Sequence, residues 1–385
     1  MAQADLNHAK NAKNDEFYTQ YIDIQNEINA YLEYNPDVFR DKTVLLPCDD
    51  PEWSNFTKFF AQNFELLGLK KLISTSYAIE SKNKNRPPQQ QVPYQVSLFD
   101  LGSPLYDGSV DKVQGKIYTL TRDRNNSGKI NIDDLEWQYL EGDGDFRSDE
   151  VKALRDEADI IVTNPPFSLL KQFMAWIMEA NKEFIIIGGM NAITYKEIFP
   201  LIKNNKIWLG NGFKAGNAYF KPLYGDVNEY ANGVYDEKTG LVKFRNCCWF
   251  TNLEHGRRHQ PLQLMTMADN LKYSRHKDLR ETGYLKYDNY DAIEVPYTDA
   301  IPSDYDGIMG VPISFLDKYC PEQFDILGMC ENLDLYGLKT RVYTTAECQQ
   351  RYFELFGKKG TYDLNASGVI NGTKVYQRIL IRKKV

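Results

Sequence analysis

The sequence predicts an α/β fold with a mostly parallel, doubly wound sheet. Short apolar segments rich in β-branched residues alternate with segments whose apolar residues recur at helical spacing, which is the pattern of parallel strands covered by helices. The chain has 385 residues, 42% of them hydrophobic, so it can bury a large core. At this length we expect one large domain and a smaller second one.

The N-terminal part begins with a polar segment. Residues 1–14 show no apolar periodicity, and we expect them to form a mobile arm. No apolar run approaches the length of a membrane helix, so we expect a cytoplasmic protein without a membrane partner. From Asp15 onward, apolar and aromatic residues recur at helical spacing and predict a helix that packs on the domain: Phe17, Tyr18, Tyr21, Ile24, Ile28, Tyr31 and Leu32.

The alternation of strands and helices continues up to residue 253. Apolar segments predict strands at 43–46, 72–75, 137–140, 160–162, 183–188, 206–209 and 247–250, the last of them antiparallel. A helix is predicted over 148–157, where Ser148 is a suitable N-cap. A second helix, 169–177, is apolar on most of its surface and is expected to lie in the core.

The segment between residues 116 and 134 has two interpretations. Asp123, Asn125, Ser127, Gly128 and Asp134 have the spacing of a calcium-binding loop. The last position is Asp instead of the usual Glu, and residues 116–120 alternate like a strand instead of a helix. A hairpin turn that uses the same Asn and Gly chemistry is therefore the alternative.

The segment DIIVTNPPF, residues 159–167, is where we expect the site to form. Residues 160–162 are β-branched and predict a buried strand, after which Pro165 and Pro166 forbid both helix and ladder pairing. The carbonyls of Asn164 and Pro165 then lie on a rigid frame beside an amide and the Phe167 ring. Such a group suits a planar ligand with an NH2 group, since it offers two acceptors and one surface for stacking.

The tetrapeptide Asn164-Pro165-Pro166-Phe167 resembles the catalytic motif of the amino-methyltransferases, which move a methyl group from S-adenosylmethionine to an exocyclic or amide nitrogen. Further segments resemble one branch, the EcoRI methylase family of adenine-specific DNA methyltransferases, over most of the length: KNDEFYTQ, LLPCDDPEWSNF, GDGDFRSDE, VPISFLDKYCPEQFDILG and RILIRKK. The resemblance implies a Rossmann-like S-adenosylmethionine-dependent fold and a C-terminal DNA-recognition part. It also implies N6 methylation of adenine in a specific duplex DNA sequence, by base flipping and direct transfer, and a place in a restriction-modification system in which a cognate endonuclease acts on the same site.

The same resemblance assigns roles to individual residues. Asn164, Pro165, Pro166 and Phe167 are implied to be catalytic, the first two by accepting the hydrogens of the target amine. The implied cofactor-binding residues are Phe17, Tyr18, Thr19, Pro47, Asp49, Asp50, Asp145 and Phe146. Among these, residues 17–19 fold over the methionine end of the cofactor, Asp49 or Asp50 receives its ammonium group, Asp145 accepts its adenine amine, and Phe146 packs on the adenine ring.

Two departures from the wider superfamily keep alternatives open. The loop after the first strand has no glycine, and no acidic residue ends the second strand to hold the cofactor ribose. Asp49 and Asp50 could instead form a turn before a helix near Pro51, and the acidic turn at 142–145 could merely lead into the next helix. An enzyme acting on RNA adenine or protein glutamine, or an inactive DNA-binding relative, are the alternative functions.

The composition changes beyond residue 253. The net charge is −7, yet residues 257–286 and 374–384 are net basic. We therefore assign 1–253 to the catalytic domain and 254–385 to DNA recognition, with residues 254–300 as loops that interleave charge and aromatic rings. The predicted DNA contacts are Arg257, Arg258, Arg275, Lys277 and Arg280, and a solvated basic face is the alternative. Six cysteines without C-x-x-C spacing and only four histidines predict reduced thiols and no metal site.

Overall fold

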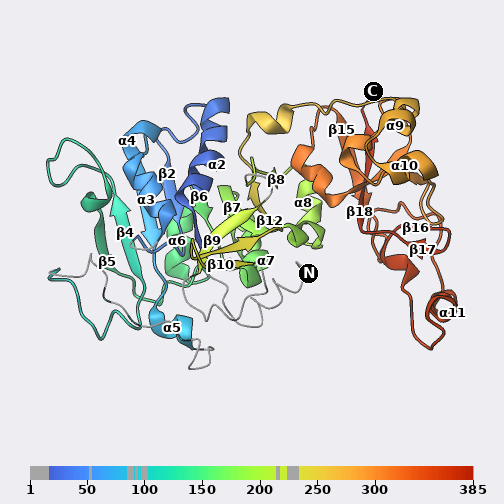
Figure 1. Ribbon diagram of the computed structural model, residues 1–385. Helices are drawn as coiled ribbons and strands as arrows, with labels where there is room; N and C mark the ends of the chain where they lie inside the picture. The colour runs from blue at the N-terminus through green and yellow to red at the C-terminus, as the bar shows by residue number, and fades with distance from the viewer. Residues whose placement is uncertain are drawn as a thin grey trace. The chain divides into compact units, whose positions relative to one another are not determined.

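The computed structural model describes residues 17–51, 54–84, 91, 94, 96, 103–213, 217–222 and 234–384. The predicted N-terminal arm lies outside these residues. The chain divides into two compact units, Met1–Gly256 and Arg257–Val385 (Figure 1), where the sequence predicts a boundary at residue 253.

An eight-stranded sheet forms the centre of the first unit, in the order β5-β4-β3-β2-β6-β7-β12-β8. Its strands are β2 (Thr43–Leu46), β3 (Lys71–Thr75), β4 (Lys116–Leu120), β5 (Glu136–Tyr139), β6 (Ile160–Thr163), β7 (Glu183–Gly189), β8 (Trp208–Leu209) and β12 (Cys247–Thr251). Each predicted strand is present, and the antiparallel β12 is confirmed. The sheet is mixed: β3, β2, β6 and β7 pair in parallel, and antiparallel pairs follow on both sides, so that β4 and β12 run opposite to the other six strands of this sheet.

The segment between β4 and β5 is a hairpin connection. Asp134 is almost fully buried and accepts hydrogen bonds from the backbone N–H groups of Asn125 (3.2 Å) and Asn131 (3.0 Å). Asp123 accepts the N–H of Gly128 (2.7 Å), which has the positive φ of a tight turn. These carboxylates hold the backbone of the turn, so turn chemistry explains the spacing that resembles a calcium loop.

Helices cover both faces of the sheet. The helices described in the first unit are α2 (Tyr21–Tyr34), α3 (Asn55–Gln62), α4 (Phe64–Leu67), α5 (Ile79–Asn83), α6 (Asp149–Glu157), α7 (Leu170–Glu179) and α8 (Phe199–Lys203). On one face, Val44 of β2 shares a core with Ile28 of α2 and Phe60 of α3. On the other, Gly188 of β7 lies against Leu170 of α7. Ser148 caps α6 as predicted, and no helix in the described part of the chain is long and apolar enough to cross a membrane.

A second sheet in this unit has the order β1-β9-β11-β10, with β1 (Phe17–Thr19), β9 (Ala218–Pro222), β10 (Tyr235–Asp236) and β11 (Leu241–Phe244). Residues 17–19, predicted as helical, are therefore a strand that pairs antiparallel with β9. Gln20 has an extended backbone, so the helix starts only at Tyr21. Aromatic and β-branched residues suit a strand, and here the pairing partner, which is distant in sequence, decides the conformation.

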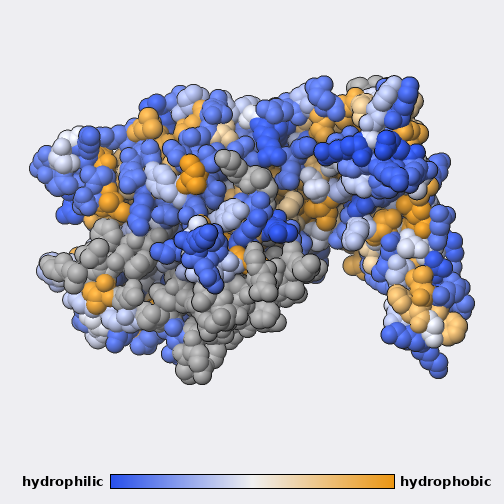
Figure 2. Space-filling model, viewed as in Figure 1, coloured by the Kyte–Doolittle hydropathy of each residue, from blue (hydrophilic) through white to orange (hydrophobic). Residues whose placement is uncertain are grey.

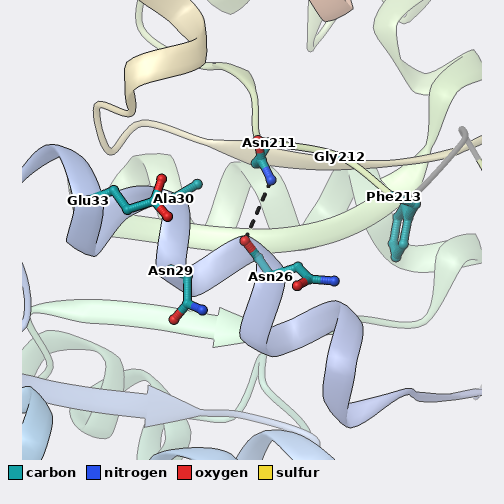
Figure 3. A pocket seen from close by; sticks show the side chains of 7 residues that line it. All are labelled: Asn26, Asn29, Ala30, Glu33, Asn211, Gly212 and Phe213. Atoms are coloured by element: carbon teal, nitrogen blue, oxygen red, sulfur yellow. Dashed lines mark hydrogen bonds between the residues drawn. The ribbon is translucent and has the colours of Figure 1, made fainter.

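A buried carboxylate ties α2 to the segment that follows β8. Glu27 is fully buried and accepts hydrogen bonds from the backbone N–H groups of Asn211 (2.8 Å) and Gly212 (2.9 Å). Figure 3 shows the Asn211 side chain reaching the carbonyl of Asn26 on the same helix, at 3.5 Å. Phe213 follows and stacks on a core tryptophan. These contacts attach Asn211 and Gly212, which precede β9 in the sequence, to α2.

The second unit contains a sheet of order β13-β14-β18-β15, with β13 (Ala292–Glu294), β14 (Ile308–Pro312), β15 (Phe324–Met329) and β18 (Arg378–Lys383). Its other elements are α9 (Met267–Tyr273), α10 (Lys277–Thr282), α11 (Thr345–Phe356), β16 (Val369–Ile370) and β17 (Thr373–Lys374). Residues 254–300 are therefore not only loops, since they form α9, α10 and β13. These helices are short and bury few side chains, so they leave little periodicity in the sequence.

The basic RILIRKK segment forms a strand in the core of the second unit. Strand β18, which this segment forms, is central to its sheet, and its residues Ile379, Leu380 and Ile381 are fully buried. Arg378 is also buried, and its guanidinium pairs with Glu294. All six cysteines of the chain are free thiols, as predicted, and all except Cys48 are buried.

The Glu27 contacts lead to a stability prediction. Glu27→Ala leaves the N–H groups of Asn211 and Gly212 and the hydroxyl of Tyr31 without their acceptor, so we expect a loss of about 3 kcal/mol in the free energy of unfolding. Urea denaturation measures it. Glu33→Ala, at an exposed position of the same helix, is the matched control and should change little. Equal effects of the two substitutions would contradict this role of Glu27.

Candidate active site

The loops that follow β2 and β6 lie at the switch point of the large sheet. Strand β3 pairs with one side of β2 and β6 with the other, so the direction of winding reverses between β2 and β6. In α/β folds, ligands bind in the crevice outside the carboxyl ends of the strands at such a point. Residues 47–50 follow β2 and the tetrapeptide 164–167 follows β6. The fold therefore brings the predicted cofactor loop and the predicted catalytic loop to one place.

Thr163, the last residue of β6, links these two loops. Its hydroxyl lies 2.7 Å from the carbonyl oxygen of Pro47 and 2.6 Å from Oδ2 of Asp49. The other carboxyl oxygen of Asp49 accepts a hydrogen bond from the hydroxyl of Ser54 (2.7 Å), the N-cap of α3. A hydroxyl group has one proton to donate. The Thr163 hydroxyl therefore shares its proton between these two acceptors, unless a protonated Asp49 donates to it in return.

The environment of Asp49 favours this protonated form. The side chain is 7% exposed, and burial raises the pKa of the carboxyl to about 7, although hydrogen bonds from Thr163 and Ser54 act in the opposite direction. Asp49 thus connects elements within the protein. Asp50, its half-buried neighbour, is the more accessible of the two aspartates predicted to receive an ammonium group.

Aromatic contacts hold the end of the tetrapeptide that is predicted to be catalytic. Pro165 is buried, whereas Asn164 and Phe167 are half-buried. The Phe167 ring makes edge contacts with Phe220 of β9 and Phe244 of β11, at centroid distances of 6.3 and 6.4 Å. The second sheet therefore positions the ring that is predicted to stack on a base.

Strand β1 belongs to the same second sheet. Thr19 pairs with Phe220, and its carbonyl accepts a hydrogen bond from the side chain of Asn55 (2.7 Å) at the start of α3. The Thr19 hydroxyl is buried and has no hydrogen-bond partner within the described part of the chain. Tyr18 is half-buried, and the side chain of Phe17 lies outside the described residues.

The acidic turn after β5 packs against the end of β3. Gly144 has φ +83°, and a Cβ atom there would collide with the carbonyl oxygen of Ser76, so only glycine fits. The carbonyl of Asp143 accepts the N–H of Ala78 (2.8 Å). Asp145 and Phe146 are thereby brought beside the chain that leaves β3.

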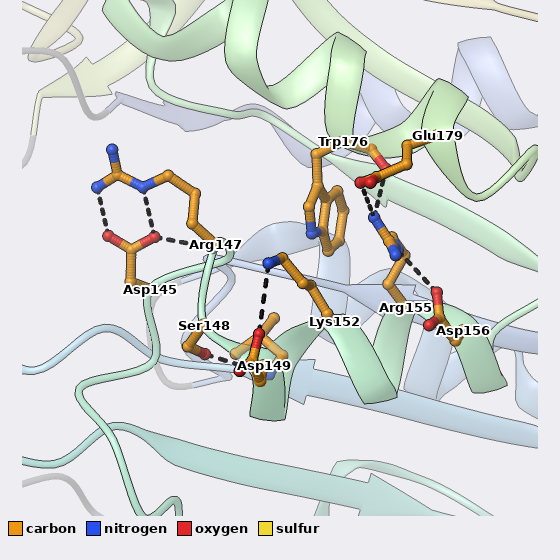
Figure 4. A network of polar contacts seen from close by, with 10 residues as sticks. Asp145, Arg147, Ser148, Asp149, Lys152, Arg155, Asp156, Trp176 and Glu179 are labelled. Carbon is orange, nitrogen blue, oxygen red and sulfur yellow. Dashed lines mark hydrogen bonds and ion pairs between the residues drawn. The ribbon is translucent and has the colours of Figure 1, made fainter.

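The side chains of Asp145 and Phe146 have partners within the protein. Both carboxylate oxygens of Asp145 accept hydrogen bonds from the guanidinium of Arg147, at 2.8 and 2.5 Å (Figure 4). Burial disfavours the charge on Asp145, but these bonds outweigh it and lower the pKa below its ordinary value. Phe146 is 3% exposed and packs against Phe173 and Trp176 of α7. A ring packed in this way has little area to offer an adenine, so its predicted role rests on the resemblance.

Two residues near these loops escape prediction from the sequence. Tyr77 follows β3, and burial, together with the charges of Asp143 and Asp145, raises the pKa of its hydroxyl. Lys82 on α5 is close enough to Asp49 for its charge to oppose the rise in that pKa. The carboxyl end of the second strand is where a ribose contact is expected, and Tyr77 lies just beyond it. Nothing in the sequence indicates a role for Lys82 at the site, because a lysine on a short helix cannot be told from any other surface charge.

The predicted DNA contacts lie in the second unit: Arg257, Arg258, Arg275, Lys277 and Arg280. Arg258 is only 7% exposed and lies beside an aromatic ring, which argues against a contact at the surface. Arg275 pairs with Asp299 (3.0 Å), and Lys277 pairs with Glu281 (3.5 Å). The DNA role of this cluster stays a prediction, and acidic partners reduce the charge that it offers.

Known proteins resemble this chain over most of its length. The family model described as "Adenine-specific methyltransferase EcoRI" matches residues 5–384. The Type II methyltransferase M.EcoRI of Escherichia coli is 40% identical over 330 residues, which are 86% of this chain and 90% of that protein. M.MpnI of Mycoplasma pneumoniae is 32% identical over 344 residues, covering 88% of this chain and 90% of the relative. M.MgeORF184P of Mycoplasma genitalium is 32% identical over 387 residues, with 98% of each chain covered. No solved structure matches.

A mixed α/β fold, two loops meeting at a switch point and these relatives define the class of protein: it is a methyltransferase. More narrowly, the chain belongs to the EcoRI family of adenine-specific methyltransferases, which confirms the resemblance seen in the sequence.

The buried Asp49 predicts a pH dependence of stability. Its pKa is raised from 3.8 to about 7 on folding, so the stability that it contributes is fully present below pH 3.8 and is lost as the pH rises to about 7. Three pH units correspond to at most about 4 kcal/mol. Asn at this position can donate to Thr163 and accept from Ser54 without ionising.

We therefore expect Asp49→Asn to flatten the fall in unfolding free energy between pH 5 and pH 8, as measured by urea denaturation at several pH values. Asp50→Asn, at the half-buried neighbouring position, is the matched control and should keep the wild-type slope. If Asp49→Asn kept the wild-type pH profile of unfolding free energy, a group other than Asp49 would have to cause the pH dependence.

Proposed function

We propose that the protein transfers a methyl group from S-adenosylmethionine to the N6 amino group of adenine in a specific duplex DNA sequence. The observation that carries the proposal is the link through Thr163, which joins the tetrapeptide 164–167 to the loop after β2 at the switch point. Methyl donor and target base must meet in one crevice for direct transfer. The first unit is then a Rossmann-like catalytic domain, and the second recognises the target.

The residues at this crevice fit the groups of S-adenosylmethionine. The Thr19 hydroxyl, buried without a hydrogen-bond partner in the described part of the chain, is available to a ligand. The carboxylate of Asp50 suits an ammonium group and the side chain of Lys82 a carboxylate. Asp145 can accept an adenine amine beside Arg147, because each carboxylate oxygen has two lone pairs. Bound in this way, the cofactor supplies an activated methyl group.

The protein's own contribution is to prepare the target nitrogen. The lone pair of adenine's exocyclic amine is delocalised into the ring, which makes it a poor nucleophile. The Asn164 side-chain oxygen and the Pro165 carbonyl accept the two amine hydrogens, which favours tetrahedral geometry and localises the lone pair. Two prolines hold both acceptors rigidly, so little reorganisation is needed at the moment of reaction.

A base within a duplex cannot reach these acceptors, so it must be flipped out at a cost of a few kcal/mol. Stacking on Phe167 returns about 1–3 kcal/mol of this cost. The contacts of Phe167 with Phe220 and Phe244 hold the ring in place before the base arrives. The remaining cost is met by contacts to DNA elsewhere in the protein.

The biological setting follows from the same proposal. The partner is double-stranded DNA in the cytoplasm, and methylation of one sequence suits a restriction-modification system in which a cognate endonuclease cuts the same site when it is unmethylated. The relatives named Type II methyltransferases support this setting.

The first test is the reaction itself. Purified protein given labelled S-adenosylmethionine and genomic DNA should produce N6-methyladenine within one sequence motif, detected by nucleoside analysis and by sequencing. RNA, protein and cytosine should remain unlabelled. Label confined to RNA or protein would support the alternative substrates, and no label in any of them would indicate an inactive relative.

The second test concerns the tetrapeptide. We expect Asn164→Ala to reduce turnover by at least about 100-fold, because the acceptor that preorganises the amine is lost, while the Kd for S-adenosylmethionine changes little. Phe167→Ala should mainly weaken retention of the flipped base, read as 2-aminopurine fluorescence at the target position. Asn204→Ala, at an exposed position of the same unit, is the control. Near-normal turnover of Asn164→Ala would exclude the catalytic role of that amide.

A further inference from the structure

Residues 339–376 form a small lobe of the second unit around α11. Four buried side chains make its core: Tyr343, Cys348, Leu364 and Val369. Cys348 is the only buried residue among the 12 of α11. Arg351 anchors the same side of the helix, because its guanidinium donates to the carbonyl of Gly372 (2.7 Å) and the hydroxyl of Thr373 (3.1 Å). One face of α11 is thus attached to the β16–β17 hairpin.

Another face of α11 is open to solvent. Gln349, Phe353 and Phe356 follow the spacing i, i+4 and i+7, so they share this face. Phe353 is 55% exposed and Phe356 is 54% exposed. Figure 2 shows apolar side chains gathered over α11 among hydrophilic ones. The Phe356 ring also contacts Tyr352, at a centroid distance of 4.7 Å, whereas both phenyl rings remain more than half exposed on a helix that buries a single side chain. Such exposed apolar area is typical of a contact surface.

The lobe is basic within an acidic protein. The chain has a net charge of −7, whereas residues 339–376 contain six Lys or Arg and three Asp or Glu, a net charge of +3. Two of the three acids are already paired, Glu347 with Arg341 (2.6 Å) and Glu354 with Arg351 (3.1 Å). Lys358 and Lys359 are exposed just after the end of α11.

We propose that this face of α11 enters the major groove of duplex DNA, and that Lys358 and Lys359 contact the phosphates. The major groove admits an α-helix, a glutamine can pair with adenine N6 and N7, and phenylalanine can contact the thymine methyl group. The positive charge of the lobe complements the phosphates. A two-fold contact between the same face of two copies would instead bring like charges together. This role of α11 rests on the proposed function.

The lysines are tested by the salt dependence of DNA binding. The probe is a 30-base-pair duplex that carries the motif methylated by the wild type. The double variant Lys358→Ala/Lys359→Ala should bind more weakly and lower the slope of log K against log salt by about two, because two phosphate contacts are lost. Lys286→Ala/Lys318→Ala, two exposed lysines of the second unit outside the lobe, is the matched control. Equal slopes for both double variants would overturn the phosphate contacts.

The helix face is tested by sequence discrimination. Gln349→Ala and Phe353→Ala should each reduce the preference for the motif over a scrambled duplex by about 5-fold or more, while the Kd for S-adenosylmethionine and the Tm stay unchanged. Leu66→Ala, which removes an apolar side chain that is 78% exposed in the first unit, is the control.

Two results would overturn the proposal while leaving the proposed function intact. One is wild-type discrimination in both helix variants of an enzyme that methylates DNA. The other is that the helix variants lose a self-association that the wild type shows in sedimentation, while their DNA binding stays unchanged. That result would assign the face to a contact with a second copy of the chain. If the wild type does not methylate DNA at all, the proposed function itself fails, and binding of a 30-base-pair duplex of arbitrary sequence by wild type and lysine variant still decides whether α11 contacts DNA.

Discussion

One hydroxyl group holds the candidate active site together. Thr163 ends β6 directly before the tetrapeptide, and its oxygen touches both the Pro47 carbonyl and the Asp49 carboxyl of the neighbouring loop. The hydroxyl has one proton for these two acceptors, and burial favours a protonated Asp49, which would satisfy both contacts at once. The two loops cannot move independently while this bridge persists. A displacement of the loop after β2 would reach Asn164 through a single residue.

A second set of contacts acts on the other end of the tetrapeptide. Phe167 rests on Phe220 and Phe244, whose strands belong to the small sheet that β1 completes. Asn211 and Gly212, which precede β9 of this sheet in the sequence, are attached to α2 by their hydrogen bonds to Glu27. The tetrapeptide is thus oriented by polar contacts at its beginning and by aromatic contacts at its end. Both sets come from segments more than 45 residues away in the sequence.

The sequence predicts the strands of the large sheet well, since most of them carry a compact apolar signal, and 164–167 stands out because two adjacent prolines directly follow a buried β-branched strand. It does not predict that residues 17–19 form a strand, because β9, the partner that decides this, lies about 200 residues later. The antiparallel pairing of β3 with β4 also escapes, since the local pattern contains no strand direction. Sequence composition also does not reveal that Arg258 is buried, because it counts a buried guanidinium and an exposed one alike.

The position of β18 has a consequence for how the protein is made. This strand, Arg378–Lys383, lies between β14 and β15 and pairs with both, so the sheet of the second unit lacks its central member until residues 378–383 have left the ribosome. The strands of the first unit end at Thr251, and that unit can complete its core while the rest is still being synthesised. During that interval β14 and β15 each present an unpaired edge. Synthesis therefore yields the first unit before the unit that we propose selects the target, and the nascent chain is most exposed to aggregation between the synthesis of β14 and that of β18.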